Sequence, residues 1–335
     1  MPDVCRENQY ERHLYVFSIY EVLTFFNFIF FEGALNSINF AETKFEMEGL
    51  EHNLKYNVLV PNEPTVVTEV RDKIITEFKD LVFDPEPHKY YLGDKVLPSV
   101  STIAHKFEVE EDWDAIAARY AENNGFTADY WKDKWRFKNL IATTTGTSVH
   151  EYGESLGWLR NGHPEFITEE NKVKYISDKG WLIPTRPKEE AILKFYDNFP
   201  RDLHFILAEA KVYSNKGEAS DVKTQYAGTF DLAAWYDHPT DKSKSGVIIL
   251  DYKTNGSLYS DFSRVRGKFL LPPFNEYYSE AFSEYIIQLS LYAMALRGIG
   301  LPVIGLRVIW LKEDGEYELI KVKDLSQEKW FKEAF

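Results

Sequence analysis

The pattern of apolar residues in the second half of the chain predicts a sheet that begins with three consecutive strands. Nearly continuous apolar runs, rich in β-branched and aromatic residues, cover residues 204–213, 226–236 and 246–254. The polar segments that join these runs are too short to hold crossover helices. The three strands are therefore expected to form an antiparallel meander.

A buried helix and two further strands are predicted after the meander. Residues 284–296 are apolar on nearly every face of a helix, and Gly298 suits its C-terminal cap. Strand patterns follow at residues 303–311 and 316–322. A helix is also expected before the meander, so the predicted order is helix, three strands, helix, strand.

The helix before the meander is predicted from TTTGTSVHEYGESLGWL, residues 143–159. Its apolar stripe at helical spacing consists of Val149, Tyr152, Leu156 and Leu159. Earlier in the chain, turn signals at Asp84–Pro87 and Gly93–Asp94 bracket a short hairpin. Ser99 or Ser101 is then expected to cap a helix.

Residues 1–82 are predicted to be an N-terminal, aromatic-rich extension, and residues 83–335 a single domain. The extension contains LYVFSIYEVLTFFNFIFF, residues 14–31, which has almost the length of a membrane span. Glu21 and Asn27 interrupt it, and the acidic residues before it argue against a signal peptide. The interpretations left open are a buried helix or oligomer contact, an interfacial membrane segment and a poorly ordered extension.

Composition narrows the class of protein. The only cysteine among 335 residues is Cys5, which excludes an internal disulfide, a four-cysteine zinc site and a self-contained iron–sulfur cluster. This composition fits a reducing, intracellular setting. The formal charge of −14 does not favour nucleic-acid binding, although a local basic patch and acids that hold metal are both compatible with it.

Charged residues lie on two neighbouring predicted strands. Asp251 and Lys253 follow the run GVIIL and lie on the same side of their strand, while Tyr252 faces the other way. Asp231 lies on the neighbouring strand, so two carboxylates can approach closely and suit Mg²⁺ or Mn²⁺. Gly228 is expected to leave room for a ligand backbone. Taken alone, an Asp-x-Lys triplet like residues 251–253 is more often a strand end exposed to solvent.

Two helices add further polar positions. Gly146 and His150 lie on the helix before the meander, and Gln288 and Tyr292 lie one turn apart on the apolar helix after it. Individually, these residues fit a structural histidine, a buried amide and a core tyrosine. Their occurrence together, in this order and on these elements, argues against coincidence.

The combination resembles the PD-(D/E)xK nuclease superfamily, and within it the RecB-type exonucleases that include phage-encoded and mitochondrial genome-maintenance enzymes. The resemblance covers roughly residues 83–325 and rests on the segments GTSVHEYGE, AEAKVY, GTFDLAAW, LDYKT and QLSLY. It implies an α/β fold with an αβββαβ core, in which helices flank a mixed central sheet. The segment FDPEPHKYYLGDKVLPSVSTIAHKF, residues 83–107, is also similar to the start of the phage proteins.

The resemblance also implies a role for individual residues. Asp231 and Asp251 match the metal-binding acids, and Lys253 matches the catalytic lysine. His150 matches a metal-binding histidine. The remaining positions implied by the resemblance are the carbonyl of Tyr252 as a further ligand, Glu209 as an acid of less defined role, Gln288 and Tyr292 as DNA contacts, and Thr254 as a phosphate contact.

The expected function is that of an exonuclease that uses one or two Mg²⁺ or Mn²⁺ ions to hydrolyse DNA from its ends. The expected setting is viral DNA replication, recombination or repair, in the host cytoplasm if a phage encodes the protein. A recombinase or a single-strand-binding protein is a candidate partner, and the oligomeric state is open. The alternatives are a DNA-end-binding or recombination partner protein without turnover, and a restriction-type endonuclease. The four cysteines of the iron–sulfur subgroup are absent, so no cluster is expected.

An acidic protein that binds DNA must concentrate its positive charge locally. The best candidate is SRVRGKF, residues 263–269, in which Arg264, Arg266 and Lys268 alternate shortly after the strand that carries Lys253. The segment is expected to be a loop that contacts phosphates, and the alternative is a solvated surface loop.

Overall fold

The structure is a computed structural model, and it describes residues 50–53, 55–56, 58–214 and 225–335. These residues belong to one compact unit, residues 49–335. The apolar segment 14–31, with its alternative interpretations, lies outside the described residues. Among the described helices, none is both long enough and apolar enough to cross a membrane.

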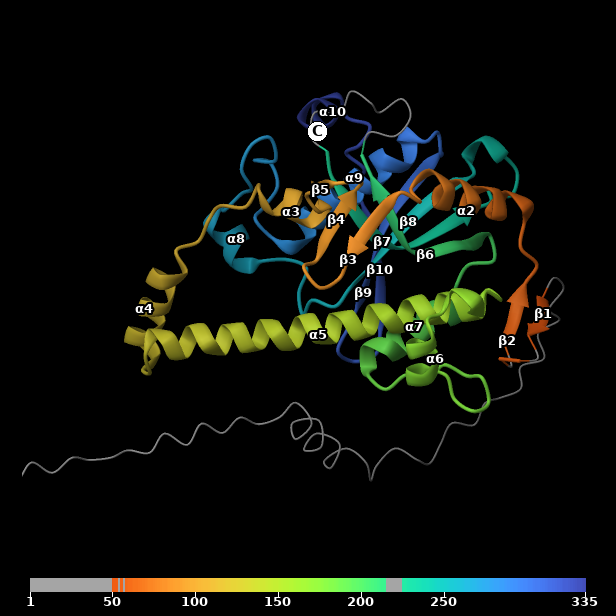
Figure 1. Cartoon of the computed structure of the whole chain (residues 1–335). Coiled ribbons are helices and arrows are strands. Elements are labelled where there is room, and N and C mark those ends of the chain that lie inside the picture. The colour runs from red at the N-terminus through yellow and green to blue at the C-terminus, as the bar shows by residue number, and fades with distance from the viewer. Residues whose placement is uncertain (1–49, 54, 57, 215–224) are drawn as a thin grey trace, which may run out of the picture. The chain divides into compact units, whose positions relative to one another are not determined.

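A mixed five-stranded sheet forms the centre of the unit (Figure 1), with the strand order β10-β9-β8-β7-β6. Its strands are β6 (Leu203–Tyr213), β7 (Ala227–Tyr236), β8 (Gly246–Lys253), β9 (Val303–Leu311) and β10 (Tyr317–Val322). β6, β7 and β8 pair antiparallel, β8 pairs parallel with β9, and β9 pairs antiparallel with β10. The predicted meander and the two later strands are confirmed.

The parallel pairing of β8 and β9 requires a crossover, which α9 (Ala281–Gly298) provides. α9 is apolar on all sides because it lies between the sheet and other elements, and eleven of its residues are buried. The prediction of a cap at Gly298 is wrong. Gly298 is still helical, and Gly300, with a φ of 77°, takes the left-handed conformation that ends the helix.

Helices cover the sheet on both sides, as expected. α5 (Ala128–Arg160) and α7 (Pro187–Asp197) lie along the side opposite α9 in Figure 1. The predicted apolar stripe of α5 is buried in full: Val149, Tyr152, Leu156 and Leu159. The N-terminal half of α5 extends beyond the edge of the sheet, and α4 (Trp113–Asn124) packs against its end.

The predicted hairpin is confirmed as part of a small three-stranded sheet. The strands are β3 (Leu81–Asp84), β4 (Lys89–Leu92) and β5 (Lys95–Leu97). Helix α3 (Val100–His105) follows, and the side chain of Ser99 caps it by accepting a hydrogen bond from the Thr102 N–H at 3.0 Å.

Part of the N-terminal segment packs on the same core. Helix α2 (Thr65–Glu77) covers β6, and its residues Val67, Val70 and Ile74 are buried. The Arg71 Nε donates to the carbonyl of Ile206 at 2.5 Å.

The remaining elements are β1 (Leu50–Asn53), β2 (Val58–Pro61), η1 (Pro164–Phe166), α6 (Glu169–Tyr175), η3 (Lys242–Lys244), α8 (Asp261–Arg266) and α10 (Lys329–Ala334).

Candidate functional site

Two acidic residues meet where β7 and β8 lie side by side. Leu232 pairs with Leu250 in the antiparallel register, so the next positions, Asp231 and Asp251, face each other. Both are buried, with exposed fractions of 6% and 2%. The N–H of Tyr252 donates to Asp231 Oδ2 at 2.5 Å, which fixes one carboxylate oxygen against the neighbouring strand.

His150 reaches the same point from α5. Its Nδ1 lies 3.0 Å from Asp231 Oδ1, and its ring packs edge-on against Tyr252 with 5.9 Å between centroids. The approach depends on Gly153, because a Cβ there would lie 2.8 Å from Cε2 of Tyr252. The helix histidine and the strand acid, 81 residues apart in sequence, therefore form one cluster.

Glu209 joins this cluster through an unusual backbone conformation in β6. The residues on either side of it pair regularly with β7, but Glu209 itself has a φ of 51°. A left-handed glutamate is strained, and such strain tends to occur at functional sites. Ligand atoms of His150, Glu209 and Asp231 all lie within 4.8 Å of one another.

Lys253 lies beside the two acids and forms an ion pair with Asp251. Its Nζ lies 4.4 Å from the ring centroid of Tyr285, a favourable cation–π position. Burial acts to lower the pKa of Lys253, but the charges of Asp251, Tyr285 and Asp231 together outweigh burial, and the pKa is raised. The side chain therefore remains a cation at neutral pH.

If all of its carboxyl groups were ionised, the site would hold more negative charge than its protein partners neutralise. Burial and the charge of Asp231 raise the pKa of Asp251 to about 6, and burial and the charge of Glu151 raise that of Glu154 to about 7. The pKa of Glu209 is raised well above its usual value by burial and by Asp231. A divalent cation would relieve this repulsion, and the donor set of carboxylates and one imidazole suits Mg²⁺ or Mn²⁺.

The cluster opens into a cleft of about 550 Å³. The lining residues are His88, Ala142, Thr143, Gly146, Thr147, His150, Glu151, Glu154, Glu209, Asp231 and Thr254. Glu154 is not among the predicted site residues. The sequence signal that could have identified Glu154 is its position one helical turn after His150, because residues four apart share a helix face.

The pair Gln288 and Tyr292 connects α9 to β7. The Gln288 Nε2 donates to the Tyr292 hydroxyl at 3.1 Å, and that hydroxyl donates to the carbonyl of Thr229 at 2.8 Å. Tyr292 is buried, and its ring fills the space above Gly228, where an added Cβ would lie 2.7 Å from Cε1 of Tyr292. The expectation that Gly228 makes room for a ligand backbone is therefore wrong, because a core tyrosine occupies that room.

Thr254 lines the cleft directly after Lys253, and a buried cation fixes its backbone. The Lys188 Nζ donates to the Thr254 carbonyl at 2.6 Å and pairs with Glu313 at 2.6 Å. Lys188, on α7, is a second residue that was not predicted. Its partner is 66 residues away, so no local pattern could reveal the contact.

The basic segment 263–269 is not the expected loop. Its first residues belong to helix α8, which ends at Gly267 with a φ of 61°. The Arg264 guanidinium is held by Glu280 through contacts of 2.9 and 2.8 Å, and Lys268 pairs with Glu111. Arg264, Arg266 and Lys268 are not among the residues that line the cleft, and a role in binding phosphates stays a prediction.

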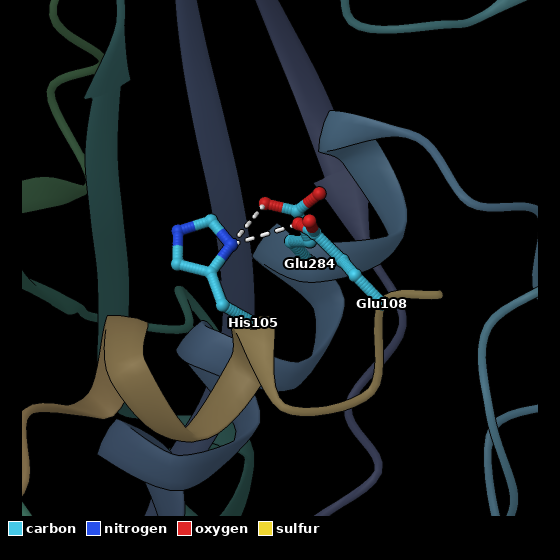
Figure 2. A group of neighbouring side chains, drawn as sticks. All are labelled: His105, Glu108 and Glu284. Carbon is cyan, nitrogen blue, oxygen red and sulfur yellow. Dashed lines mark hydrogen bonds and ion pairs between the residues drawn. The ribbon is translucent and has the colours of Figure 1, made fainter. Parts of the chain in front are cut away.

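A second group of possible ligands lies between α3 and α9, where His105, Glu108 and Glu284 point toward one another (Figure 2). The His105 Nδ1 is 2.8 Å from Glu108 Oε1 and 3.4 Å from Glu284 Oε2. Burial and the adjacent Glu108 raise the pKa of Glu284 to about 9. A proton on Glu284 thus allows the two carboxyl groups to lie together without a cation.

Comparisons with known proteins did not place the chain in a family. No family model matches the sequence, and no curated protein sequence matches it significantly. The geometry of the cleft is therefore the basis for assigning a function.

Proposed function

We propose that the chain is a metal-dependent DNA exonuclease with a PD-(D/E)xK core of the RecB type. The observation that carries the proposal is the convergence of three acids and one lysine on the adjacent strands β6, β7 and β8 with one histidine from α5. Asp231 and Asp251 face each other, Lys253 pairs with Asp251, and His150 and Glu209 lie against Asp231. A solvated strand end would leave these groups exposed, whereas Asp231, Asp251 and the side chain of Lys253 are 6%, 2% and 14% exposed.

The residues divide into metal ligands and a charge stabiliser. His150, Glu209 and Asp231 would hold a divalent cation, with Asp251 available as a further carboxylate. When bound, the cation would lower the pKa of the attacking water and offset charge on the phosphate. Asp251 keeps Lys253 positioned and protonated, so the ammonium is suited to stabilising negative charge on the phosphate rather than to removing a proton.

The central test compares two DNA substrates. End-labelled linear DNA and covalently closed circles of the same sequence are incubated with Mg²⁺ or with EDTA. We expect rapid loss of end label from linear DNA with Mg²⁺, intact circles under the same conditions and no cleavage in EDTA. Cleavage of the circles would favour the endonuclease alternative, and binding of ends without cleavage would favour the binding protein without turnover.

The role of His150 predicts a specific dependence of activity on pH. Burial acts to lower the pKa of His150, but the charge and hydrogen bond of Asp231 raise it above 6.5. Because a protonated imidazole cannot bind metal, activity should fall as pH drops through this raised pKa and recover as pH rises again.

His150→Ala should weaken metal affinity by about 10- to 100-fold, which is the typical loss when a residue that supports a metal site is substituted. The measurement is cleavage rate against Mn²⁺ concentration from about pH 6 to pH 9. The variant should be most impaired at low Mn²⁺ and should lose the acidic limb of the wild-type profile, whereas excess Mn²⁺ should restore much of its rate. The matched control is His163→Ala, since His163 contacts Glu63 and Glu165 away from the cleft. Equal rates for wild type and His150→Ala at every Mn²⁺ concentration would make His150 a structural residue.

A further inference from the structure

The α4–α5 arm, residues 113–142, projects from the sheet as a helical hairpin (Figure 1). Aromatic rings hold the two helices together: Trp113 contacts Trp135 at 5.9 Å between centroids, and Tyr120 contacts Trp131 at 5.5 Å and Trp135 at 5.3 Å. Beyond this contact α5 has no cover among the described residues, because every side chain from 136 to 144 is exposed.

A groove of about 490 Å³ lies along one face of α5, and all of its lining residues belong to this helix. Its lining residues are Trp131, Lys134, Trp135, Phe137, Lys138 and Ile141. Three are aromatic, two are cationic and none is acidic, in a chain whose formal charge is −14. Phe137 and Ile141 are 60% and 51% exposed, and the Lys134 Nζ lies 4.7 Å from the ring centroid of Trp131.

The composition of the groove distinguishes between two kinds of occupant. A helix from another protein would cover the apolar side chains, but interfaces between proteins are depleted in lysine. Exposed aromatic rings interleaved with cations are the combination that binds a single strand, because each base can stack on a ring while the phosphates meet the cations. The lysines of this groove therefore favour a nucleic acid.

We infer that the groove binds an unpaired stretch of nucleic acid outside the catalytic cleft, an inference that rests on the proposed nuclease function for its choice of substrate. Phe137 and His150 are thirteen residues apart on one helix, which corresponds to about 20 Å along its axis. They also lie roughly 140° apart around the helix, so the groove and the cleft face different sides of α5. A strand in the groove is thus a second contact that lengthens the footprint on the substrate.

The test compares two double variants on the same exposed stretch of helix. Phe137→Ala with Lys138→Ala removes a ring and a cation from the groove. Arg136→Ala with Leu140→Ala also removes a cation and an exposed apolar side chain, but neither residue lines the groove. Because all four side chains are exposed, both variants are expected to fold, and circular dichroism checks this.

The measurement is fluorescence anisotropy of labelled oligo-dT in EDTA, which prevents cleavage, at several salt concentrations. For a strand of about 30 nucleotides, longer than one single-strand site, we expect the groove variant to bind at least about tenfold more weakly. Its salt dependence should be shallower by about 0.7 unit of slope for each phosphate that the variant no longer neutralises. The control variant should bind like the wild type, and a ribo-oligonucleotide of the same length shows whether the groove selects DNA.

The outcomes separate this inference from the proposed function. Equal affinities for both double variants, or no binding by the wild type, would overturn the groove as a nucleic-acid site. A change of assembly state in the groove variant, measured by light scattering, without a change in DNA affinity would assign the surface to a second copy of the chain. Groove-dependent binding by a protein that cleaves no DNA would support the groove and overturn the nuclease.

Discussion

Asp231→Asn and Asp251→Asn are each expected to reduce the rate of DNA cleavage by more than about 100-fold, beyond the usual loss from a residue that only supports a metal site. Asparagine keeps the shape of aspartate but removes the negative charge that attracts a divalent cation. Calorimetry should show weaker Mn²⁺ binding in both variants. Asp237→Asn is the matched control, because Asp237 directly follows the last residue of β7 and pairs with Lys242 outside the cleft.

These substitutions are expected to leave the fold intact, and for Asp251 the effect on stability has a defined sign. Its pKa is raised from 3.8 to about 6 in the folded protein, so the folded state holds the proton more tightly than the unfolded state. The contribution of Asp251 to stability therefore decreases as pH rises from about 4 to about 6.

Asp251→Asn should lack this contribution when the unfolding of metal-free protein by urea is measured across that pH range. The difference in unfolding free energy between wild type and variant should therefore change with pH.

The calorimetry tests the metal site itself. If Mn²⁺ bound with wild-type affinity to both aspartate variants, the assignment of the metal site would be wrong.

Lys253→Met is expected to reduce kcat by about 10²- to 10³-fold while metal binding is retained. Methionine has a similar length but no charge, so it removes the cation that we propose stabilises the phosphate. This separates Lys253 from the ligands, whose loss should weaken Mn²⁺ binding as well. Asp251 would be left without its ion-pair partner, so a moderate loss of stability is also expected.

Lys188→Met provides the matched control for the loss of a buried ammonium. Lys188 also has an acidic partner, Glu313, and its contact with the cleft passes through the carbonyl of Thr254. We expect this variant to lose stability but to retain much more of its kcat than Lys253→Met. The measurements are single-turnover cleavage rates at saturating Mn²⁺ and thermal unfolding. Similar cleavage rates in the two variants would argue against a direct role for Lys253.

The elements of the central sheet were predictable because their signals are local. The apolar runs of β6, β7 and β8 each indicate a buried strand, and the short segments between them exclude any pairing other than a meander. The apolar stripe on α5 likewise follows from helical spacing alone. The placement of the helix end at Gly298 was less secure, because Gly300, two residues later, is an equally good glycine.

The candidate site was predictable only in part. The alternation of side chains places Asp251 and Lys253 on one side of β8, and the meander brings Asp231 next to them. The contact of His150 with Asp231 depends on how closely α5 approaches the sheet, which Gly153 and the ring of Tyr252 determine. The left-handed backbone of Glu209 has no signal in a strand pattern.

The sequence by itself determined the order and type of the main elements, and it placed the two aspartates and the lysine on β7 and β8. These properties depend on periodicity and on neighbours within a few residues. Only the tertiary structure decided which polar groups neutralise one another. Arg264 and Lys268 looked like free cations in a loop, but they are held by Glu280 and Glu111, which lie 16 and 157 residues away along the chain. Lys134 and Lys138 lie in a groove without acidic lining residues for the same reason. Burial and ion pairing depend on which distant segments the fold brings into contact, and no local pattern records that.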